Sequence, residues 1–498
     1  MPRVPAENSD RATKLLYHLV LLLTVWYIVV FVAVAGLRLN YPFELEWMEG
    51  GAVDHVNRVL SGQKLYVSPS LEFTPFIYTP AYFYISAIAA KLLGVGFTPL
   101  RLVSLLSAIG CGALIFRIVV RETKQRYPAI LAVGLFAAAY PLSGAWYDVA
   151  RADSLFLLLT LGTVYVIRFS ASWRGHVLAG LFMCLAFLTK QPALVVCLAI
   201  GVCCVIGHPR RSLAYLGSTV LSISGSIVLL NYIHEGWFSY YVFKLPSQHP
   251  LLPEMLAGYW TRDLMAPLAV GCLIALFYLF DGFTRSSKKT VLFYSFVAIG
   301  MLGASWGSRV HAGGFSNVLM PAYTAIAVLF GLGVHRALDM TRSASGTKRL
   351  LHCYVLVACS LQFLVLLYNP AAQIPTKQDA EGGRDLVDFI HRVPGDVFVP
   401  YHSRLPALAG KPTYAHAMAI NDVLRGDAAP ARDRLLRELS EAIRARRFDA
   451  IILDEPWFMA EIEEYYVRAQ AVFPGEAEFW TVTGMPTRPQ FVYVPRAQ

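Results

Sequence analysis

Long apolar runs, each about the length of a membrane-spanning helix, recur along the first 370 residues. The first runs from Leu15 to Gly36 and follows three basic residues, Arg3, Arg11 and Lys14. A helix needs about 20 predominantly apolar residues to cross a bilayer. A basic start favours a cytoplasmic N-terminus. We therefore predict an uncleaved first membrane helix whose N-terminus is inside the cell.

A shorter apolar run, Pro80 to Leu93, decides the predicted topology. At about 14 residues it is too short to span comfortably. The long run that follows it, Pro99–Val120, ends beside Arg121, Lys124 and Arg126. This basic cluster is cytoplasmic, as the positive-inside rule requires, only if Pro80–Leu93 does not cross. We expect that segment to lie on the outer surface or to dip into it.

With each remaining apolar run the turns alternate between the two sides of the membrane, and every second turn contains basic residues such as Arg210 and Lys289. Together they predict an all-α polytopic membrane domain over residues 1–370, with about eleven transmembrane helices, its N-terminus inside and its C-terminus outside. The stretch 177–207 has a second interpretation, because one kinked helix could occupy part of it. The predicted spans are 15–36, 99–120, 129–146, 154–169, 177–189, 191–207, 213–233, 264–281, 290–306, 318–336 and 352–368.

After Asn369 the sequence becomes mixed and charged, with no run long enough to span. Arg384–Arg392 and Ala431–Arg447 have helical patterns, while Asp396–Tyr401 and Asp449–Leu453 have patterns typical of strands. We therefore predict a small extracytoplasmic α/β domain over residues 371–498.

Composition agrees with a multi-pass protein of the cell membrane. The chain is 56% hydrophobic and 15% charged, with a mean hydropathy of +0.50, whereas soluble domains carry about 25% charged residues. The net charge of +10 does not indicate nucleic-acid binding, because the basic residues punctuate apolar runs and form no continuous stripe. The 8 cysteines lie in or beside apolar segments without metal-ligand spacing, which favours buried thiols over disulfides or zinc ligands.

The first outer loop, residues 37–98, carries three carboxylates close to a helix end: Glu44, Glu46 and Glu49. A charge near hydrocarbon costs roughly 3 kcal/mol or more. Three like charges there need a cation, a substrate or water. The loop is either a solvated acidic turn or an acid/base centre at the membrane surface.

Other turns on the same predicted side supply cations: Arg151 beside Asp153, Lys190 in L-T-K-Q-P, and Arg309 with His311. Each has an ordinary explanation, since Arg151 can pair with Asp153, Lys190 can extend to the headgroups, and 309–311 can be a plain turn. Independent turns that surround one carboxylate-rich loop favour a shared site. Carboxylates can deprotonate a hydroxyl, cations can hold a phosphate, and aromatic residues suit a sugar or an isoprenoid chain.

The motifs, taken in order, resemble the start of the GT-C class of polytopic glycosyltransferases, in the branch of protein O-mannosyltransferases and aminoarabinose transferases. An acidic loop precedes a short helix ending at Ser61-Gly62, and an aromatic and proline-rich run ends at residues 78–84. Arg151–Leu155 resembles the signature that opens the family's fourth helix. Leu188–Pro192 resembles its L-T-K-G-P turn, and Asn317–Pro321 its Y-L-L-P helix start. The resemblance covers roughly residues 15–370.

Three positions depart from the family pattern. The family's acidic pair is usually Asp-Glu, but Met48 precedes Glu49 here. Either Glu49 acts alone or Glu46 takes the role of the missing carboxylate. Gln191 replaces a glycine, and Thr79 stands where relatives often carry Lys.

The resemblance implies transfer of a sugar from a polyprenyl-phosphate donor to a lipid, glycan or protein acceptor on the outer face, with inversion. No cofactor is identified, and a divalent metal is left open. A lipid-diphosphate-dependent ligase or polymerase is the second interpretation. A lipid or glycan transporter is the third interpretation. It ranks last because transporters typically have internal repeats and charges near the bilayer midplane, whereas here the charges gather at helix ends and no repeat is visible. The implied residues are Glu46 and Glu49 for catalysis, Arg151, Asp153, Lys190, Arg309 and His311 for substrate or donor phosphate, and Glu44, Tyr78, Tyr82 and Asn317 as further candidates.

Overall fold

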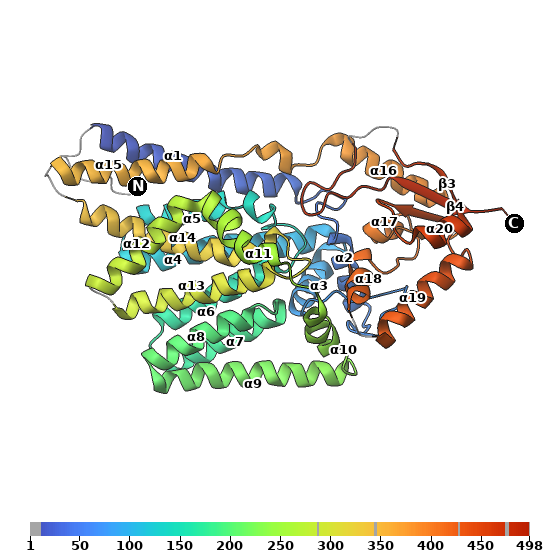
Figure 1. Ribbon diagram of the computed structural model, residues 1–498, viewed down its shortest axis with the longest axis horizontal. Coiled ribbons are helices and arrows are strands. Elements are labelled where there is room, and N and C mark those ends of the chain that lie inside the picture. The colour runs from blue at the N-terminus through green and yellow to red at the C-terminus, as the bar shows by residue number, and fades with distance from the viewer. Residues whose placement is uncertain (1–10, 286–287, 343–345, 427–428, 474–477, 498) are drawn as a thin grey trace.

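Apolar helices run side by side in a bundle that occupies most of the chain, and a small mixed domain lies at one end of it (Figure 1). The computed structural model describes residues 11–285, 288–342, 346–426, 429–473 and 478–497. Within these residues, eleven helices fall on the ranges predicted as spans. They are α1 (Arg11–Arg38), α4 (Phe97–Thr123), α5 (Arg126–Ala138), α6 (Asp153–Phe169), α7 (Trp173–Thr189), α8 (Ala193–Gly207), α9 (Pro209–Ile233), α12 (Ala266–Arg285), α13 (Lys288–Arg309), α14 (Met320–Met340) and α15 (Gly346–Val365).

Seven helices of the described ranges are long and apolar enough to cross a membrane, while α7 and α8 are shorter apolar helices. The stretch 177–207 therefore forms two helices, separated at Lys190–Pro192, and not one kinked helix. The fold is mostly helical, as expected for a polytopic membrane protein. The number of helices that cross and the direction of the chain stay predictions.

The helix predicted over 129–146 ends early, at Ala138. Pro141 lacks the backbone N–H needed to continue the helical hydrogen bonds, and it begins a 3₁₀ turn, Pro141–Ser143. Gly144 and Ala145 then adopt positive φ angles of 71° and 54°, which no α-helix contains. The chain that follows forms a turn, which carries the buried side chains of Trp146, Asp148 and Arg151.

The first loop forms two short helices between the bundle and the C-terminal domain (Figure 1). They are α2 (Glu49–Leu60) and α3 (Ala81–Leu93), which pack on each other and on α4. With 13 residues, α3 is too short to span and also contacts α7. This arrangement agrees with an outer-surface segment, whose position in the membrane stays a prediction. Short helices α10 (Trp237–Ser239) and α11 (Pro253–Gly258) lie in the loop between α9 and α12.

The C-terminal domain is built on a four-stranded sheet with the order β1-β2-β4-β3. β1 pairs parallel to β2, and β4 runs antiparallel between β2 and β3. The sequence patterns predicted α16, α19, β1 and β2 but missed β3 and β4. The elements are α16 (Lys377–Arg392), β1 (Val397–Phe398), α17 (Leu405–Leu408), α18 (Ala417–Arg425), α19 (Ala429–Arg444), β2 (Ala450–Leu453), α20 (Met459–Tyr465), β3 (Tyr466–Ala471) and β4 (Phe491–Pro495).

The two faces of this sheet enter different hydrophobic cores. Val397 and Ile452 pack toward α16 residues such as Leu386. Their strand neighbours Phe398 and Ile451 join a core that also contains first-loop residues, because successive side chains on a strand alternate between faces. The C-terminal domain, predicted from composition as residues 371–498, is therefore packed against the first loop through a shared core.

A buried histidine adds a polar contact between the same two parts. His402 contacts Glu44 of the first loop through Nδ1, and its Nε2 lies 2.9 Å from the Asp454 carboxylate. Burial alone would lower the pKa of His402, but the carboxylates of Asp454 and Glu44 raise it to about 10. The two carboxylates thus favour the protonated form of His402. Glu44 therefore anchors the C-terminal domain.

The topology can be tested with reporter fusions. We expect a fusion after Arg126 to be cytoplasmic and one after Lys377 to be external, because basic residues concentrate in cytoplasmic turns. A fusion after His208, in another basic turn, should be cytoplasmic as well. An external Arg126 fusion would show that α3 crosses and that the orientation is reversed from that point.

Candidate active site

Buried ion pairs gather at the end of the bundle that faces the C-terminal domain. Their burial matters because an isolated charge in a protein interior is strongly unfavourable, so each must be paired and hydrogen-bonded. They join the first loop and the turn before α6 to the helices. The pairs are Arg38–Asp148 at 2.6 Å, Arg101–Glu49 at 2.6 Å, Arg151–Glu46 at 3.0 Å and Lys190–Asp153 at 2.5 Å.

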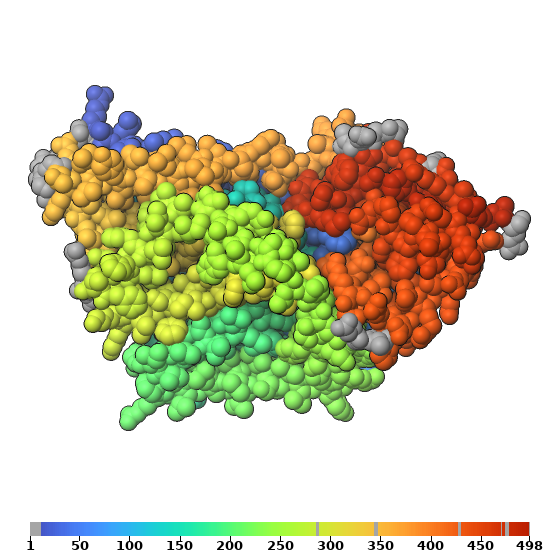
Figure 2. All heavy atoms as spheres, viewed as in Figure 1, coloured from blue at the N-terminus to red at the C-terminus, as the bar shows by residue number. Residues whose placement is uncertain are grey.

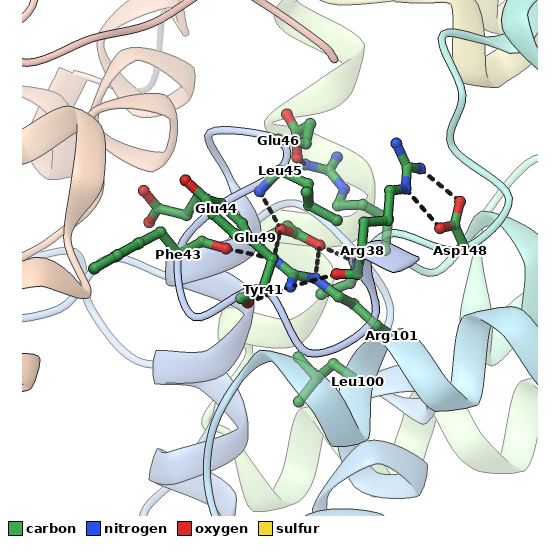
Figure 3. Close-up of polar contacts among 12 residues, drawn as sticks. Arg38, Tyr41, Phe43, Glu44, Leu45, Glu46, Glu49, Leu100, Arg101 and Asp148 are labelled. Atoms are coloured by element: carbon green, nitrogen blue, oxygen red, sulfur yellow. Dashed lines mark hydrogen bonds and ion pairs between the residues drawn. The ribbon is translucent and has the colours of Figure 1, made fainter. Parts of the chain in front are cut away.

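Arg101, in the first turns of α4, holds the first loop in place (Figure 3). Its Nε and Nη2 donate to the two oxygens of Glu49, at 3.0 and 2.6 Å. It also donates to the backbone carbonyls of Tyr41 and Phe43, at 2.6 and 2.5 Å. A fully buried guanidinium thereby orders the chain between α1 and α2.

Glu49 is saturated by these and two further hydrogen bonds. Its carboxylate accepts from the backbone N–H of Leu45 at 2.7 Å and of Ala150 at 2.6 Å. Burial would raise the pKa of Glu49, but Arg101 and these N–H groups lower it below its usual value. These contacts occupy both oxygens of Glu49, so the catalytic role expected for Glu49 stays a prediction that this geometry disfavours.

Glu46 has the opposite environment. Its Oε2 accepts from Arg151 at 3.0 Å and from the Met48 N–H at 3.3 Å. Its Oε1 is buried and has no hydrogen-bond partner among the residues that the structure describes. Burial raises the pKa of Glu46 to about 7, against the lowering effect of Arg151. A carboxyl group with a free oxygen and a pKa near neutrality is suited to accept a proton.

Glu46 lines a cavity of about 800 Å³ between the bundle and the C-terminal domain. The molecular surface is hollowed at this junction, where atoms of the early chain show between the bundle and the C-terminal domain (Figure 2). Gly484 closes over Glu46: its φ is +79°, and a Cβ atom there would lie 2.7 Å from Glu46 Cγ. Both halves of the protein thus contribute to one site.

Three of the predicted cations, Arg151, Lys190 and His311, line this cavity. Arg151 donates to the Tyr78 hydroxyl at 2.5 Å, and its guanidinium lies over the rings of Tyr78 and Trp146. Lys190 Nζ donates to Asp153, and Asn317 Nδ2 donates to the same Asp153 oxygen at 2.9 Å. Asp153 therefore positions Lys190 and Asn317. Tyr78 and Asn317 also line the cavity.

The beginnings of three helical segments lie beside these cations, at Asp153 of α6, Ala193 of α8 and Ser316 before α14. Helix N-termini carry partial positive charge and favour anions. Together with Arg151 and Lys190, they make this wall of the cavity suitable for a phosphate group.

Three other predicted residues do not line the cavity. Arg309 donates to Asp263 at 2.7 Å and to the Gly314 carbonyl at 2.6 Å, so it orders its own turn. The Tyr82 hydroxyl donates to the Leu100 carbonyl at 2.9 Å inside the core. Glu44 Oε2 contacts His402, while its buried Oε1 has no hydrogen-bond partner among the described residues. In this geometry the three residues contact other protein groups outside the cavity lining, and a direct contact with a donor stays a prediction for them.

Several residues of the site were missed by sequence reasoning. Arg38 and Arg101 lie within or beside apolar runs, and a charge in such a run is itself the signal that could have revealed them. His249, in the loop between α9 and α12, also lines the cavity. The C-terminal residues that line it carry no motif: Tyr401, Met418, Asn421, Asp422, Arg425, Glu455 and Met485.

The sequence did not decide whether the site uses a divalent metal. Across the described ranges, no group of three or more His, Cys, Asp or Glu side chains is placed to hold a metal ion.

Comparisons with known proteins agree with the fold and the motifs. Residues 77–233 match the family described as dolichyl-phosphate-mannose-protein mannosyltransferase. The match and the arrangement of helices confirm the resemblance to the GT-C class of polytopic membrane glycosyltransferases. Among curated proteins, the chain has no significant match.

Two solved proteins illustrate the structural likeness. ArnT from Cupriavidus metallidurans in the apo state has a TM-score of 0.63 at 13% identity, over 94% of this chain and 97% of that one. ArnT bound to undecaprenyl phosphate has a TM-score of 0.61 at 12% identity, over 95% and 98%. Archaeal oligosaccharyltransferase AglB from Archaeoglobus fulgidus, in complex with an inhibitory peptide and a dolichol-phosphate, has a TM-score of 0.52 at 12% identity, over 89% and 72%. At these identities the likeness establishes the fold.

The contrast between the two glutamates leads to a stability prediction. Glu49→Gln should lower the free energy of unfolding by about 3–5 kcal/mol, because it leaves Arg101 buried without its counter-charge. Glu46→Gln should lower it by less than about 1 kcal/mol, since the Glu46 carboxyl is already partly protonated near neutral pH. Thermal and denaturant unfolding of both purified variants would measure this. Equal stability of Glu49→Gln and the parent protein would show that the Arg101 pair does not hold the loop.

Proposed function

We propose that this protein is an integral-membrane glycosyltransferase that moves a sugar from a polyprenyl-phosphate donor to a hydroxyl acceptor on the outer face of the cell membrane. One observation carries the proposal: a glutamate with a free buried oxygen, Glu46, shares a cavity with the cations Arg151 and Lys190. The ArnT structure with undecaprenyl phosphate and the AglB structure with a dolichol-phosphate support a lipid-linked donor.

The donor phosphate would lie between Arg151 and Lys190, beside the helix N-termini. Its lipid chain would leave the cavity along α8, where Leu194 and Val195 both line the cavity and are 39% and 43% exposed on the bundle surface. A cavity with a cationic wall and an apolar exit to the bundle surface matches the two ends of a polyprenyl-phosphate sugar.

In the proposed reaction, the acceptor oxygen attacks the anomeric carbon from the face opposite the phosphate. A bond forms from that oxygen to the anomeric carbon, and the bond from the anomeric carbon to the phosphate oxygen breaks, which inverts the configuration. The hydroxyl proton moves to Glu46 Oε1. The electron pair of the broken bond stays on the leaving polyprenyl phosphate, whose additional negative charge Arg151 and Lys190 offset.

Replacement of the proposed base tests the chemistry. Glu46→Gln should slow sugar transfer by about 10²–10⁴-fold, the usual contribution of a general base. The rate of the parent protein should rise with pH through about 7, as Glu46 loses its proton, and the variant should lose this rise. Transfer is measured in nanodiscs from polyprenyl-phosphate-linked and polyprenyl-diphosphate-linked sugars, with cell-envelope lipid and glycan fractions as acceptors.

Glu235→Gln serves as the control, because Glu235 is an exposed carboxylate that pairs with Lys64 away from the cavity. A Glu46→Gln variant with the parent rate would exclude Glu46 as the base. Faster transfer from the diphosphate donor would favour a lipid-diphosphate-dependent ligase or polymerase.

Lys190 is tested by donor-product binding. Lys190→Ala should weaken the affinity for undecaprenyl phosphate about ten-fold or more, because a charge-assisted contact is worth about 1.5–3 kcal/mol. The affinity is measured by native mass spectrometry after thermal unfolding has shown that the variant is folded. Lys244→Ala, an exposed cation outside the cavity lining, is the matched control. Unchanged affinity in folded Lys190→Ala would remove Lys190 from the phosphate site.

A further inference from the structure

The wall of the cavity contributed by the C-terminal domain contains a carboxyl group that the proposed transfer chemistry does not use. Asp422, on α18, is 2% exposed and lines the cavity. Its Oδ1 has no hydrogen-bond partner among the residues that the structure describes. The two flanking side chains stop short of a hydrogen bond to Oδ1: Arg425 Nη1 lies 3.6 Å away, and His249 Nε2, which contacts the Asp422 backbone carbonyl at 3.3 Å, lies 3.8 Å away.

An unsatisfied buried oxygen carries a free-energy cost, which a bound hydrogen-bond donor would remove. Burial raises the pKa of Asp422 to about 7, against the lowering effects of Arg425 and Arg151. Arg151 also lowers the pKa of Glu46, so both carboxyl groups lie within its electrostatic reach. Asp422 and Glu46 line the same cavity.

The charges of the two walls differ. On the bundle wall, Arg151 and Lys190 provide positive charge beside Glu46. The C-terminal wall has two carboxyl groups, Asp422 and Glu455, and one guanidinium, Arg425, whose side chain is 41% exposed. The buried Asp422 carboxylate would repel an anionic acceptor at this wall. A neutral molecule with several hydroxyl groups would instead donate a hydrogen bond to Asp422.

Aromatic side chains lie beside these acceptors. Trp47 and Tyr401 both line the cavity and stack with ring centroids 5.7 Å apart. The Tyr401 hydroxyl donates to Glu455 at 2.7 Å, and this fixes both groups. A rigid aromatic surface next to carboxyl and amide groups can pack on the C–H groups of a sugar while its hydroxyls hydrogen-bond. Asn421 supplies such an amide beside Asp422.

We propose that the acceptor is a neutral glycan whose terminal sugar binds this C-terminal wall, with Asp422 accepting a hydrogen bond from one sugar hydroxyl while another lies at Glu46. The proposal rests on the proposed function and specifies its acceptor class. Asp422 acts here as a residue that binds and orients the acceptor. The proton of the attacking hydroxyl still moves to Glu46.

The test measures acceptor binding separately from donor binding. Methyl glycosides of glucose, galactose, mannose and arabinose are titrated into the full chain in nanodiscs with undecaprenyl phosphate present, and binding is followed by saturation-transfer NMR. Glucose 6-phosphate and a short Ser/Thr-containing peptide are titrated in parallel. We expect at least one neutral glycoside to bind, and to bind more tightly than the phosphorylated sugar and the peptide.

Asp422→Asn should weaken that glycoside about ten-fold at pH 8, where the parent carboxyl is ionised. Asn421→Ala, which leaves Asp422 in place, should weaken it less. Undecaprenyl phosphate affinity should be unchanged in both variants. Glu463→Gln, an exposed carboxylate outside the cavity lining, is the control.

The inference is overturned if no neutral glycoside binds, if Asp422→Asn binds it as tightly as the parent, or if the peptide or phosphorylated sugar is preferred. In each of these cases, intact binding of undecaprenyl phosphate leaves the proposed function standing. Loss of undecaprenyl phosphate binding by the parent protein would instead contradict the proposed function itself.

Discussion

The buried ion pair between Arg101 and Glu49 is the contact on which the rest of the site depends. Arg101 extends from α4 to Glu49 and to carbonyls of the chain that follows α1. Glu49 in turn accepts a hydrogen bond from Ala150, at the turn before α6. Three segments that are far apart in the sequence are thereby joined at one point. Glu46 and Arg151, three residues before Glu49 and one after Ala150, are consequently held together at the cavity.

Two carboxylates three residues apart thus have different properties because their surroundings differ. Glu49 is ionised and saturated, which suits a structural anchor. Glu46 keeps one free oxygen and has a pKa of about 7, which suits proton transfer. The cations divide in the same way: Arg101 is fully bound to protein groups, whereas Arg151 and Lys190 have partners but still line the cavity.

The hydrophobic pattern predicted the positions of the bundle helices well, because burial in a membrane or a helix bundle demands long apolar runs. It predicted the end of α5 poorly, since apolar residues continue past Pro141 while the backbone turns. The loops and turns that the sequence predicted to lie on one side supply Arg151, Lys190, Tyr78 and Glu46, which line one cavity, while their outward orientation stays a prediction. Which glutamate is free could not be predicted, because that depends on Arg101, a partner 52 residues from Glu49. The C-terminal wall was likewise missed, since Asp422 reaches the cavity only through tertiary packing.

The central claim is that a lipid-linked phosphate binds beside Glu46, and its most direct test is a cryo-EM structure in nanodiscs with undecaprenyl phosphate. We expect phosphate density within hydrogen-bond distance of Arg151 and Lys190, in the cavity that Glu46 lines, and lipid-chain density along α8. An apolar groove of about 500 Å³ between α1, α4 and α5 offers an alternative place for the lipid. Phosphate density at that groove, with none at Arg151 and Lys190, would contradict the claim.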